Sequence, residues 1–412
     1  MGNLFKIAIR NLLRYKRRTL LTASLITIGV VFVLVFMSVS GSFKNMMIGQ
    51  ITDSMLGHVQ VHRKGYVASI DNLPLNLNLK AGAVKRLETI LNDRPEIAAW
   101  SPRIKFGGMF SNFAETTNIR LNGVIPEKEF ATTPLLTSRI IEGEKEIKQG
   151  TILIPELLAK GMKVKVGDVV VIVATNKDGS VNGRQFKVGG ILQSVTGPGG
   201  RDGYIHFDDA VEVLRMEAPE VSEFAIRLKK FDGLYGFTAS LDDSLAQELN
   251  KENKPIFEVH TWEQLSPFYN IARMIDVMTF FIKLMLIAIV LISIMNVMIM
   301  AVYERIREIG TIAAIGTLPG KILSMFVIEG FCLGIVGAVV GNIVGMAFVV
   351  IVNMSRITFD FGQQKGLILQ ANINPTDILV ISVTVVIVSV IASLQPAFKA
   401  SRMEPIEALR HV

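Results

Sequence analysis

The chain of 412 residues has only one cysteine, Cys332, so it cannot form an intrachain disulfide. It also lacks a His-Glu-x-x-His segment, a cysteine pair and a Gly-x-Ser-x-Gly turn, which excludes the familiar motifs of several hydrolase classes. Two histidines, His58 and His62, alternate on a predicted strand. There they would lie about 13 Å apart, too far to share one metal ion. We therefore expect no catalytic residue, no metal site and no cofactor in this chain.

A phosphate-binding loop is missing as well, although the segment from Gly316 to Lys321 has some of its features. The spacing is one residue short, no serine or threonine follows Lys321, and the segment follows a predicted helix rather than a strand. We therefore expect that this chain does not hydrolyse ATP itself.

Charged residues are absent from four long runs, and half of all residues are hydrophobic. The uncharged runs are residues 19–43, 284–303, 330–355 and 378–398. About 20 apolar residues are enough to cross the hydrocarbon core of a bilayer as a helix. The sequence therefore predicts four transmembrane helices, at 19–43, within 271–303, at 322–355 and at 376–398.

The basic residues predict the orientation in the membrane, because lysine and arginine near span ends stay cytoplasmic. Residues 1–18 contain no acidic residue and six basic ones, namely Lys6, Arg10, Arg14, Lys16, Arg17 and Arg18. We expect this segment to be an amphipathic helix on the inner leaflet, or simply a basic topology anchor. The cytoplasmic segments are then 1–18, 304–321 and 399–412, and both termini are inside. The net charge of +7 follows partly from this bias and does not indicate nucleic-acid binding.

The long segment 44–270 is predicted to be an extracytoplasmic α/β domain of two lobes, with a strand-rich lobe inserted at about 131–222. The predicted strands are 58–62, 118–122, 151–154, 169–173, 186–188 and 224–228. The predicted helices are 81–92, 155–161, 208–216 and 235–250. Residues 261–303 contain no glycine and only one proline, Pro267, so a helix could run continuously into the second span. A short extracytoplasmic loop is expected at 356–375.

A charged segment lies between the second and third spans, and its apolar residues have helical spacing. We interpret it as a short amphipathic cytoplasmic helix that fits a groove of a partner, with a solvated turn as the alternative. The residues of this segment are Glu304, Arg305, Ile306, Arg307, Glu308, Ile309, Gly310, Ile312 and Gly316.

Small residues repeat along the third span, where Gly337, Gly341 and Gly345 are four residues apart. Glycines at this spacing let helices pack closely in lipid. The packing could be within the chain, or at a dimer or moving-helix interface. Glu329 lies near the inner end of this span, where an acid is costly unless it is paired, and we predict a contact with Lys321.

The run Glu304-Arg-Ile-Arg-Glu-Ile-Gly310, with Gly316 after it, resembles the coupling helix of the MacB/FtsX-like superfamily of ABC transporter permeases. A C-terminal run resembles the closing motif of that family, at Pro396, Arg402, Pro405, Ala408, Leu409 and Arg410. The order of one span, a large outside domain and three spans is similar too. The segment Gly57 to His62 is similar to the lipoprotein-releasing LolC/LolE branch, and no fused ATPase domain is present.

The resemblance implies a membrane α-fold with an extracytoplasmic α/β domain, in the bacterial inner membrane. It implies a homodimer or heterodimer of permeases and a separate cytoplasmic ATPase that binds ATP and Mg. Closure of the ATPases would move the coupling helix, and this motion would extract or export a lipoprotein, peptide or amphiphile. A periplasmic adaptor or acceptor is a further possible partner. The alternatives are an FtsX-like signalling subunit that activates a cell-wall hydrolase, and an adhesion or scaffold protein without an ATPase.

Overall fold

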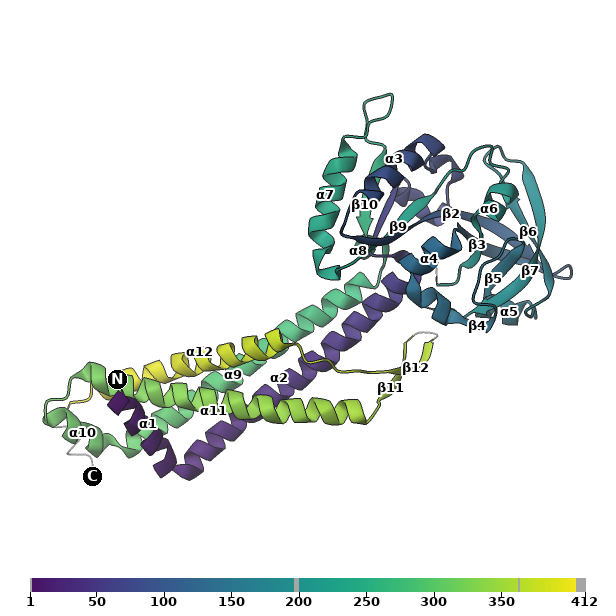
Figure 1. Ribbon diagram of the computed structural model, residues 1–412. Coiled ribbons are helices and arrows are strands. Elements are labelled where there is room, and N and C mark those ends of the chain that lie inside the picture. The colour runs from purple at the N-terminus through teal and green to yellow at the C-terminus, as the bar shows by residue number, and fades with distance from the viewer. Residues whose placement is uncertain (1, 196–199, 362–363, 405–412) are drawn as a thin grey trace. The chain divides into compact units, whose positions relative to one another are not determined.

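The computed structural model describes residues 2–195, 200–361 and 364–404, and the chain divides into two compact units. The helical unit comprises residues 1–44, 273–358 and 368–412, and the globular unit comprises residues 45–272 and 359–367. The chain passes from one unit to the other within helix α2 (Lys16–Ile51) and again within α9 (Tyr269–Glu304) (Figure 1). The predicted division into spans and one large domain is thus confirmed.

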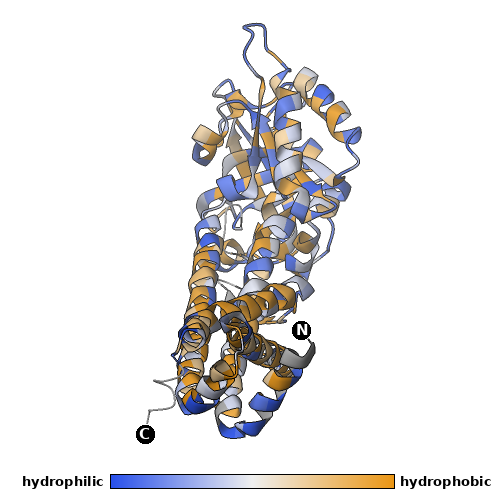
Figure 2. Ribbon diagram, turned by 90° about the vertical axis from the view of Figure 1, so that its left-hand side faces the viewer, coloured by the Kyte–Doolittle hydropathy of each residue, from blue (hydrophilic) through white to orange (hydrophobic). Residues whose placement is uncertain are grey.

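Four helices in the described residues are long and apolar enough to cross a membrane, as predicted. They are α2, α9, α11 (Pro319–Met354) and α12 (Pro375–Ser401), and Figure 2 colours much of the long helices as hydrophobic. Two shorter helices complete the unit, α1 (Gly2–Arg14) and α10 (Ile306–Ala314). The loop between α11 and α12 carries a hairpin of β11 (Thr358–Phe361) and β12 (Gln364–Ile368).

The glycine stripe of α11 packs against α2 of the same chain. A Cβ atom at Gly337 would lie 2.4 Å from Ile26, one at Gly341 would lie 2.6 Å from Val30, and one at Gly345 would lie 3.2 Å from Leu34. Such distances leave no room for a side chain, so the glycines allow the two helices to approach closely. Of the two interpretations, packing within the chain is the one that the structure shows.

The globular unit is built on a ten-stranded sheet in the order β10-β1-β9-β2-β3-β8-β5-β7-β4, with β6 beside β2 and β7. The strands are β1 (Val59–Arg63), β2 (Ile97–Ser111), β3 (Thr116–Val124), β4 (Ile140–Gly143), β5 (Thr151–Pro155), β6 (Val169–Thr175), β7 (Val181–Leu192), β8 (Gly203–His206), β9 (Glu223–Leu228) and β10 (Phe257–Thr261). The helices are α3 (Ala81–Asn92), α4 (Pro126–Thr132), α5 (Glu156–Gly161), α6 (Phe207–Val213), α7 (Leu234–Ala246) and α8 (Trp262–Leu265). The short helical turns are η1 (Thr52–Leu56), η2 (Val67–Asn72), η3 (Leu75–Leu77), η4 (Pro134–Arg139) and η5 (Phe231–Gly233).

Six of these strands close into a ring, β2-β3-β8-β5-β7-β6, because β6 pairs with both β7 and β2. The ring encloses a core that includes Phe106, Phe110, Ile172, Phe186 and Val188. Along β6 the buried residues alternate with more exposed ones, which is the pattern of a small filled barrel.

The barrel differs from the inserted lobe that was predicted at 131–222. Strand β2 pairs with β9 through residues 97–103 and with β3 through residues 103–111, so one strand belongs to both lobes. The lobe therefore begins near Arg103, and the predicted boundary was wrong. The cause is that the prediction treated 131–222 as self-contained, whereas its strands need β2 and β3 to close the barrel.

The predicted continuous helix over 261–303 is interrupted at Pro267. Helix α8 ends at Leu265, Ser266 has an extended conformation (φ −120°, ψ 126°), and α9 begins at Tyr269. Proline disfavours the helical conformation of the residue before it, which explains the break. From Tyr269 onward the helix continues for 36 residues.

A network of buried charges joins strands β2 and β9 to α4. Arg103 Nη1 is 3.0 Å from Glu223 Oε1, Arg103 Nη2 is 2.7 Å from Glu129 Oε1, and Lys105 Nζ is 3.4 Å from Glu223 Oε2. Burial by itself would raise the pKa of Glu223, but Lys105, the nearby His62 and Arg103 together hold it well below its usual range. The network therefore favours the ionised carboxylate in the folded state.

Replacing Gly341 by alanine should destabilise the helical unit by about 1–3 kcal/mol, because the new methyl group overlaps Val30 of α2. The single thiol of Cys332 is buried in α11, so its reaction with a maleimide dye on heating reports opening of this unit. Gly41→Ala in α2 is the matched control, because a Cβ atom there meets nothing within 4 Å. Equal midpoint temperatures of Cys332 labelling in Gly341→Ala and Gly41→Ala would contradict the close packing of α11 on α2.

Replacing Glu223 by glutamine should lower the stability of the globular unit by about 3–5 kcal/mol at pH 7, because buried Lys105 loses its counter-charge and Arg103 keeps only Glu129. The folded pKa lies below that of an unfolded glutamate, about 4.3, so this contribution is complete above that pH and is lost as the pH falls below it. The difference between wild type and variant should therefore shrink towards pH 3.

Urea unfolding followed by tryptophan fluorescence measures this effect, because the only two tryptophans, Trp100 and Trp262, lie in the globular unit. The control is Glu248→Gln, which breaks the partly exposed pair with Arg86 and should cost less than about 1 kcal/mol. A loss that does not change between pH 7 and pH 3 would argue against the ionised network.

Candidate functional site

The segment that resembles a coupling helix forms α10, which is shorter than the predicted range 304–321. The helix ends in a Schellman motif, in which the amide of Gly316 donates to the carbonyl of Ala313 and the amide of Thr317 donates to that of Ile312. Gly316 has φ +93°, a left-handed conformation that favours glycine. The glycine therefore ends α10 and turns the chain into α11, which starts at Pro319.

Arg305 separates α9 from α10 and is the most constrained residue of the segment. Its backbone is not helical (φ −112°, ψ 17°), and its side chain is 2% exposed. The guanidinium Nη1 lies 3.1 Å from Oε1 and 3.4 Å from Oε2 of Glu329, a carboxylate that is itself 1% exposed. The predicted partner of Glu329, Lys321, is not the one in the structure. Arg305 reaches Glu329 because the break in the chain directs its side chain towards α11.

The junction between α1 and α2 packs on the same arginine. The guanidinium carbon of Arg305 is 4.8 Å from the centroid of the Tyr15 ring, and Tyr15 is the residue between the two N-terminal helices. Next to it, Arg14 Nη1 is 3.4 Å from Glu308 Oε1. Leu12 of α1 is buried with Leu333 of α11. The N-terminal helix thus packs Leu12 against protein, and its position on the inner leaflet stays a prediction.

The exposed face of α10 is narrower than predicted. Arg305 and Ile309 were expected to contact a partner, but both are 2% exposed and lie inside the helical unit. The outward apolar side chains are Ile312 (38% exposed), Ile315 (81%) and Leu318 (65%). Around them Glu304, Arg307 and Glu308 are exposed, whereas Ile306 is half-buried and Gly310 is buried. Leu318 was missed, because it lies beyond the turn at Gly316 and outside the helical pattern.

The C-terminal motif is only partly within the described residues. Pro396 is buried inside α12, and Arg402 caps that helix with its guanidinium carbon 4.3 Å from the Phe398 ring centroid. Pro405, Ala408, Leu409 and Arg410 lie outside the described residues. The role of this motif stays a prediction.

The two histidines that were considered as metal ligands have different partners. His58 accepts a hydrogen bond at Nδ1 from the Leu228 amide at 3.0 Å. His62 stacks on Tyr66 with 5.2 Å between ring centroids, and its Nε2 is 3.5 Å from Glu223 Oε2. Both side chains thus belong to the interior of the globular unit.

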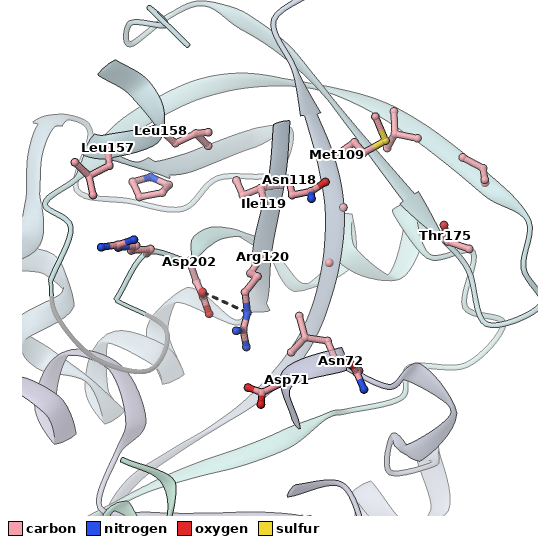
Figure 3. A pocket seen from close by; sticks show the side chains of 17 residues that line it. Asp71, Asn72, Met109, Asn118, Ile119, Arg120, Leu157, Leu158, Thr175 and Asp202 are labelled. Atoms are coloured by element: carbon pink, nitrogen blue, oxygen red, sulfur yellow. Dashed lines mark ion pairs between the residues drawn. The ribbon is translucent and has the colours of Figure 1, made fainter. Parts of the chain in front are cut away.

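An open cleft of about 810 Å³ lies in the globular unit between β2, β3, β6, α5 and the turn η2 (Figure 3). Its apolar lining includes Met109, Ile119, Leu157, Leu158 and Val181. At its polar end Arg120 Nε is 3.8 Å from Asp202 Oδ1. The volume is in the range of small-molecule sites, about 300–1,000 Å³, and the lining suits a ligand with both apolar and polar parts.

Two family models match the chain over most of its length. The MacB-like periplasmic core domain matches residues 19–244, and the FtsX-like permease C-terminal domain matches residues 280–405. The first match extends over more than half of the chain, so the globular unit is a MacB-like periplasmic domain placed between the first span and the other three.

Several known proteins are similar to this chain. The chain is 23% identical to the lipoprotein-releasing system transmembrane protein LolC of Xylella fastidiosa, over 77% of this chain and 78% of that protein. It is 23% identical to the macrolide export ATP-binding/permease protein MacB of Bdellovibrio bacteriovorus, over 79% of this chain and 49% of that protein. The crystal structure of the periplasmic region of MacB from Actinobacillus actinomycetemcomitans is 13% identical over 51% of this chain and 91% of that one, with a TM-score of 0.35.

Glu329→Gln should destabilise the helical unit by about 3–5 kcal/mol, because Arg305 is then left buried without its counter-charge. The exchanged pair, Arg305→Glu with Glu329→Arg, should recover part of this loss, since it keeps one charge of each sign. The readout is the midpoint of Cys332 labelling on heating. Glu308→Gln is the control, because its pair with Arg14 is exposed and should contribute less than about 1 kcal/mol. The role of the ion pair would be refuted if Glu329→Gln lowered the labelling midpoint no more than Glu308→Gln does and the exchanged pair recovered none of the loss.

Proposed function

Because the chain belongs to the MacB-like and FtsX-like ABC transporter permeases of the bacterial inner membrane, we propose that it couples ATP hydrolysis on a separate cytoplasmic ATPase to work done by its periplasmic domain. In this proposal both termini and α10 are cytoplasmic, as the basic residues of the N-terminal segment suggest.

The observation that carries the proposal is the exposed apolar ridge formed by Ile312 of α10, Ile315 at the C-terminal cap of that helix and Leu318 in the turn before α11. Exposed apolar side chains next to the charged residues Arg307 and Glu308 suit a groove in a partner protein. The helix is also fixed to the spans through Arg305 and Glu329. A displacement of α10 would therefore be passed to α11 rather than absorbed in a loose loop.

Transmission of motion explains the spans better than a pore does. Among the described residues of the four spans, the buried polar side chains are few and mostly small, such as Thr22, Ser38, Ser389 and Ser393. An ion pathway would need ionisable or water-lined positions within the bilayer. Helix α9, by contrast, runs without a break from Tyr269 to Glu304, directly before the coupling segment.

The substrate that we propose is a lipoprotein, peptide or other amphiphile on the periplasmic side. The cleft between β2, β3 and α5 supports this class, because it combines an apolar wall with the Arg120–Asp202 pair. A relative named for lipoprotein release and another named for macrolide export are consistent with amphiphilic cargo, whereas transmembrane signalling without transport is not favoured. We further propose that two permeases, identical or different, assemble with the ATPase.

Ile315→Asp should abolish co-purification of the ATPase subunit encoded in the same gene neighbourhood, because a carboxylate replaces the most exposed apolar side chain of the ridge. Arg307→Glu should weaken the association about tenfold through charge reversal at its edge. Pull-down from detergent extracts and ATP turnover of the purified complex measure both effects.

The matched control is Phe113→Asp, which changes an exposed aromatic side chain of the globular unit (65% exposed). It should leave the ATPase bound and its turnover unchanged. If Ile315→Asp retained the ATPase with normal turnover while its Cys332 labelling midpoint stayed at the wild-type value, the docking role of α10 would be wrong.

A further inference from the structure

A second cleft of the globular unit differs from the first in charge. It has a volume of about 920 Å³ and lies between the N-terminus of α3, the end of β1 and the loop 249–256 that precedes β10. Six basic side chains and one acidic one, Glu252, line it. The basic residues are Arg63, Lys64, Lys80, Arg86, Lys251 and Lys254. Such an excess of one sign of charge in a concave site attracts anions.

The cleft also holds a buried hydrogen-bond donor without an acceptor. Asn78, which lines the cleft, is 1% exposed, and its Oδ1 accepts a hydrogen bond from Ser222 Oγ at 2.9 Å. Its amide nitrogen Nδ2 has no acceptor among the residues that the structure describes. A buried donor without a partner is costly, so the site is suited to an oxygen atom from a ligand.

The start of α3 adds a third source of positive potential. The helix begins at Ala81 after Lys80, and no side chain caps its first amide groups. Uncapped amides and the helix dipole favour a negatively charged group at this end. A Cβ atom at the neighbouring Gly82 would meet nothing within 4 Å, so the approach to these amides is open.

Part of the cleft wall is apolar. Leu79, Ala83, Leu249 and Ile256 line it beside the basic side chains, and Leu249 is 44% exposed. A free anion has no use for an apolar wall, whereas an amphiphile places its headgroup among the cations and its chain on this wall. A flat acidic protein surface would not reach Asn78, because that side chain is almost fully buried.

We propose that this cleft binds a phosphate-bearing headgroup, with the lipid phosphate of an anionic amphiphile as its occupant. The phosphate oxygens accept hydrogen bonds from Asn78 Nδ2 and from the first amides of α3, and they are surrounded by Lys64, Lys80 and Lys251. The site is separate from the cleft of Figure 3 and does not depend on the coupling role of α10.

The test uses the full chain in phosphatidylcholine nanodiscs and two probes, dioctanoyl phosphatidic acid and inorganic phosphate, titrated by calorimetry. The variant is Lys64→Gln, Lys80→Gln and Lys251→Gln, three exposed residues whose loss should not affect folding. Binding of the lipid should weaken about tenfold, because the headgroup loses charge-assisted contacts. The matched control is Lys145→Gln, Lys165→Gln and Lys230→Gln, which removes the same charge from exposed positions outside the cleft and should leave binding unchanged.

Tighter binding of dioctanoyl phosphatidic acid than of inorganic phosphate would assign the cleft to a lipid headgroup, and the reverse order would overturn that assignment in favour of a free anion. Equal weakening by the two triple variants would overturn the proposal, because net charge alone would then explain binding. Unchanged lipid affinity in the cleft variant would overturn it too, and would leave an acidic protein surface as the partner to test. Urea unfolding of each variant, followed by tryptophan fluorescence, checks that its globular unit is folded.

Discussion

The position of the coupling segment depends on one buried ion pair, Arg305 with Glu329. Two charges with almost no exposure are stable only together, so the chain is constrained to bring the end of α9 next to α11. Tyr15 covers the same guanidinium, which brings the junction of α1 and α2 into the same contact. The junction of α1 and α2, the junction of α9 and α10, and one face of α11 thus meet at Arg305. A surface salt bridge could not do this, because separating exposed charges costs little.

In the helical unit around Arg305, some residues are tightly packed and others are exposed. The glycines of α11 let α2 approach closely, whereas Ile315 and Leu318, which follow α10, are exposed. The periplasmic domain shows the same division. Its barrel has a filled core, and the two clefts described above have different linings, one of apolar side chains beside the Arg120–Asp202 pair and the other rich in basic side chains. The surfaces that suit partners or ligands therefore lie on tightly packed elements.

Much of the architecture could be predicted from the sequence, because the relevant signals are local. The absence of charge located the four spans, and the helical spacing of apolar residues located α3 at its observed bounds, Ala81–Asn92. Strand β2 was missed because Pro102, Gly107 and Gly108 interrupt it, and such residues normally indicate turns. The burial of Arg305 was also unpredictable, since a charged residue beside other charged residues indicates a solvated face. Only the tertiary structure brings Glu329, which is 24 positions away, into contact with it. The sides of the membrane on which the loops lie stay a prediction.

The sharing of β2 between two lobes limits how such a chain can be rearranged by gene recombination. Excision of residues 131–222 would remove β4 to β8, and β2 and β3 would then have open edges beside apolar faces that were the barrel interior. Exposed edges of this kind promote aggregation. A shuffled module would therefore have to carry β2, and with it the ladder to β9 and the charges of Arg103. Diversity in this domain is easier to accommodate in the loops at the barrel ends and around the two clefts, where insertions leave every ladder intact.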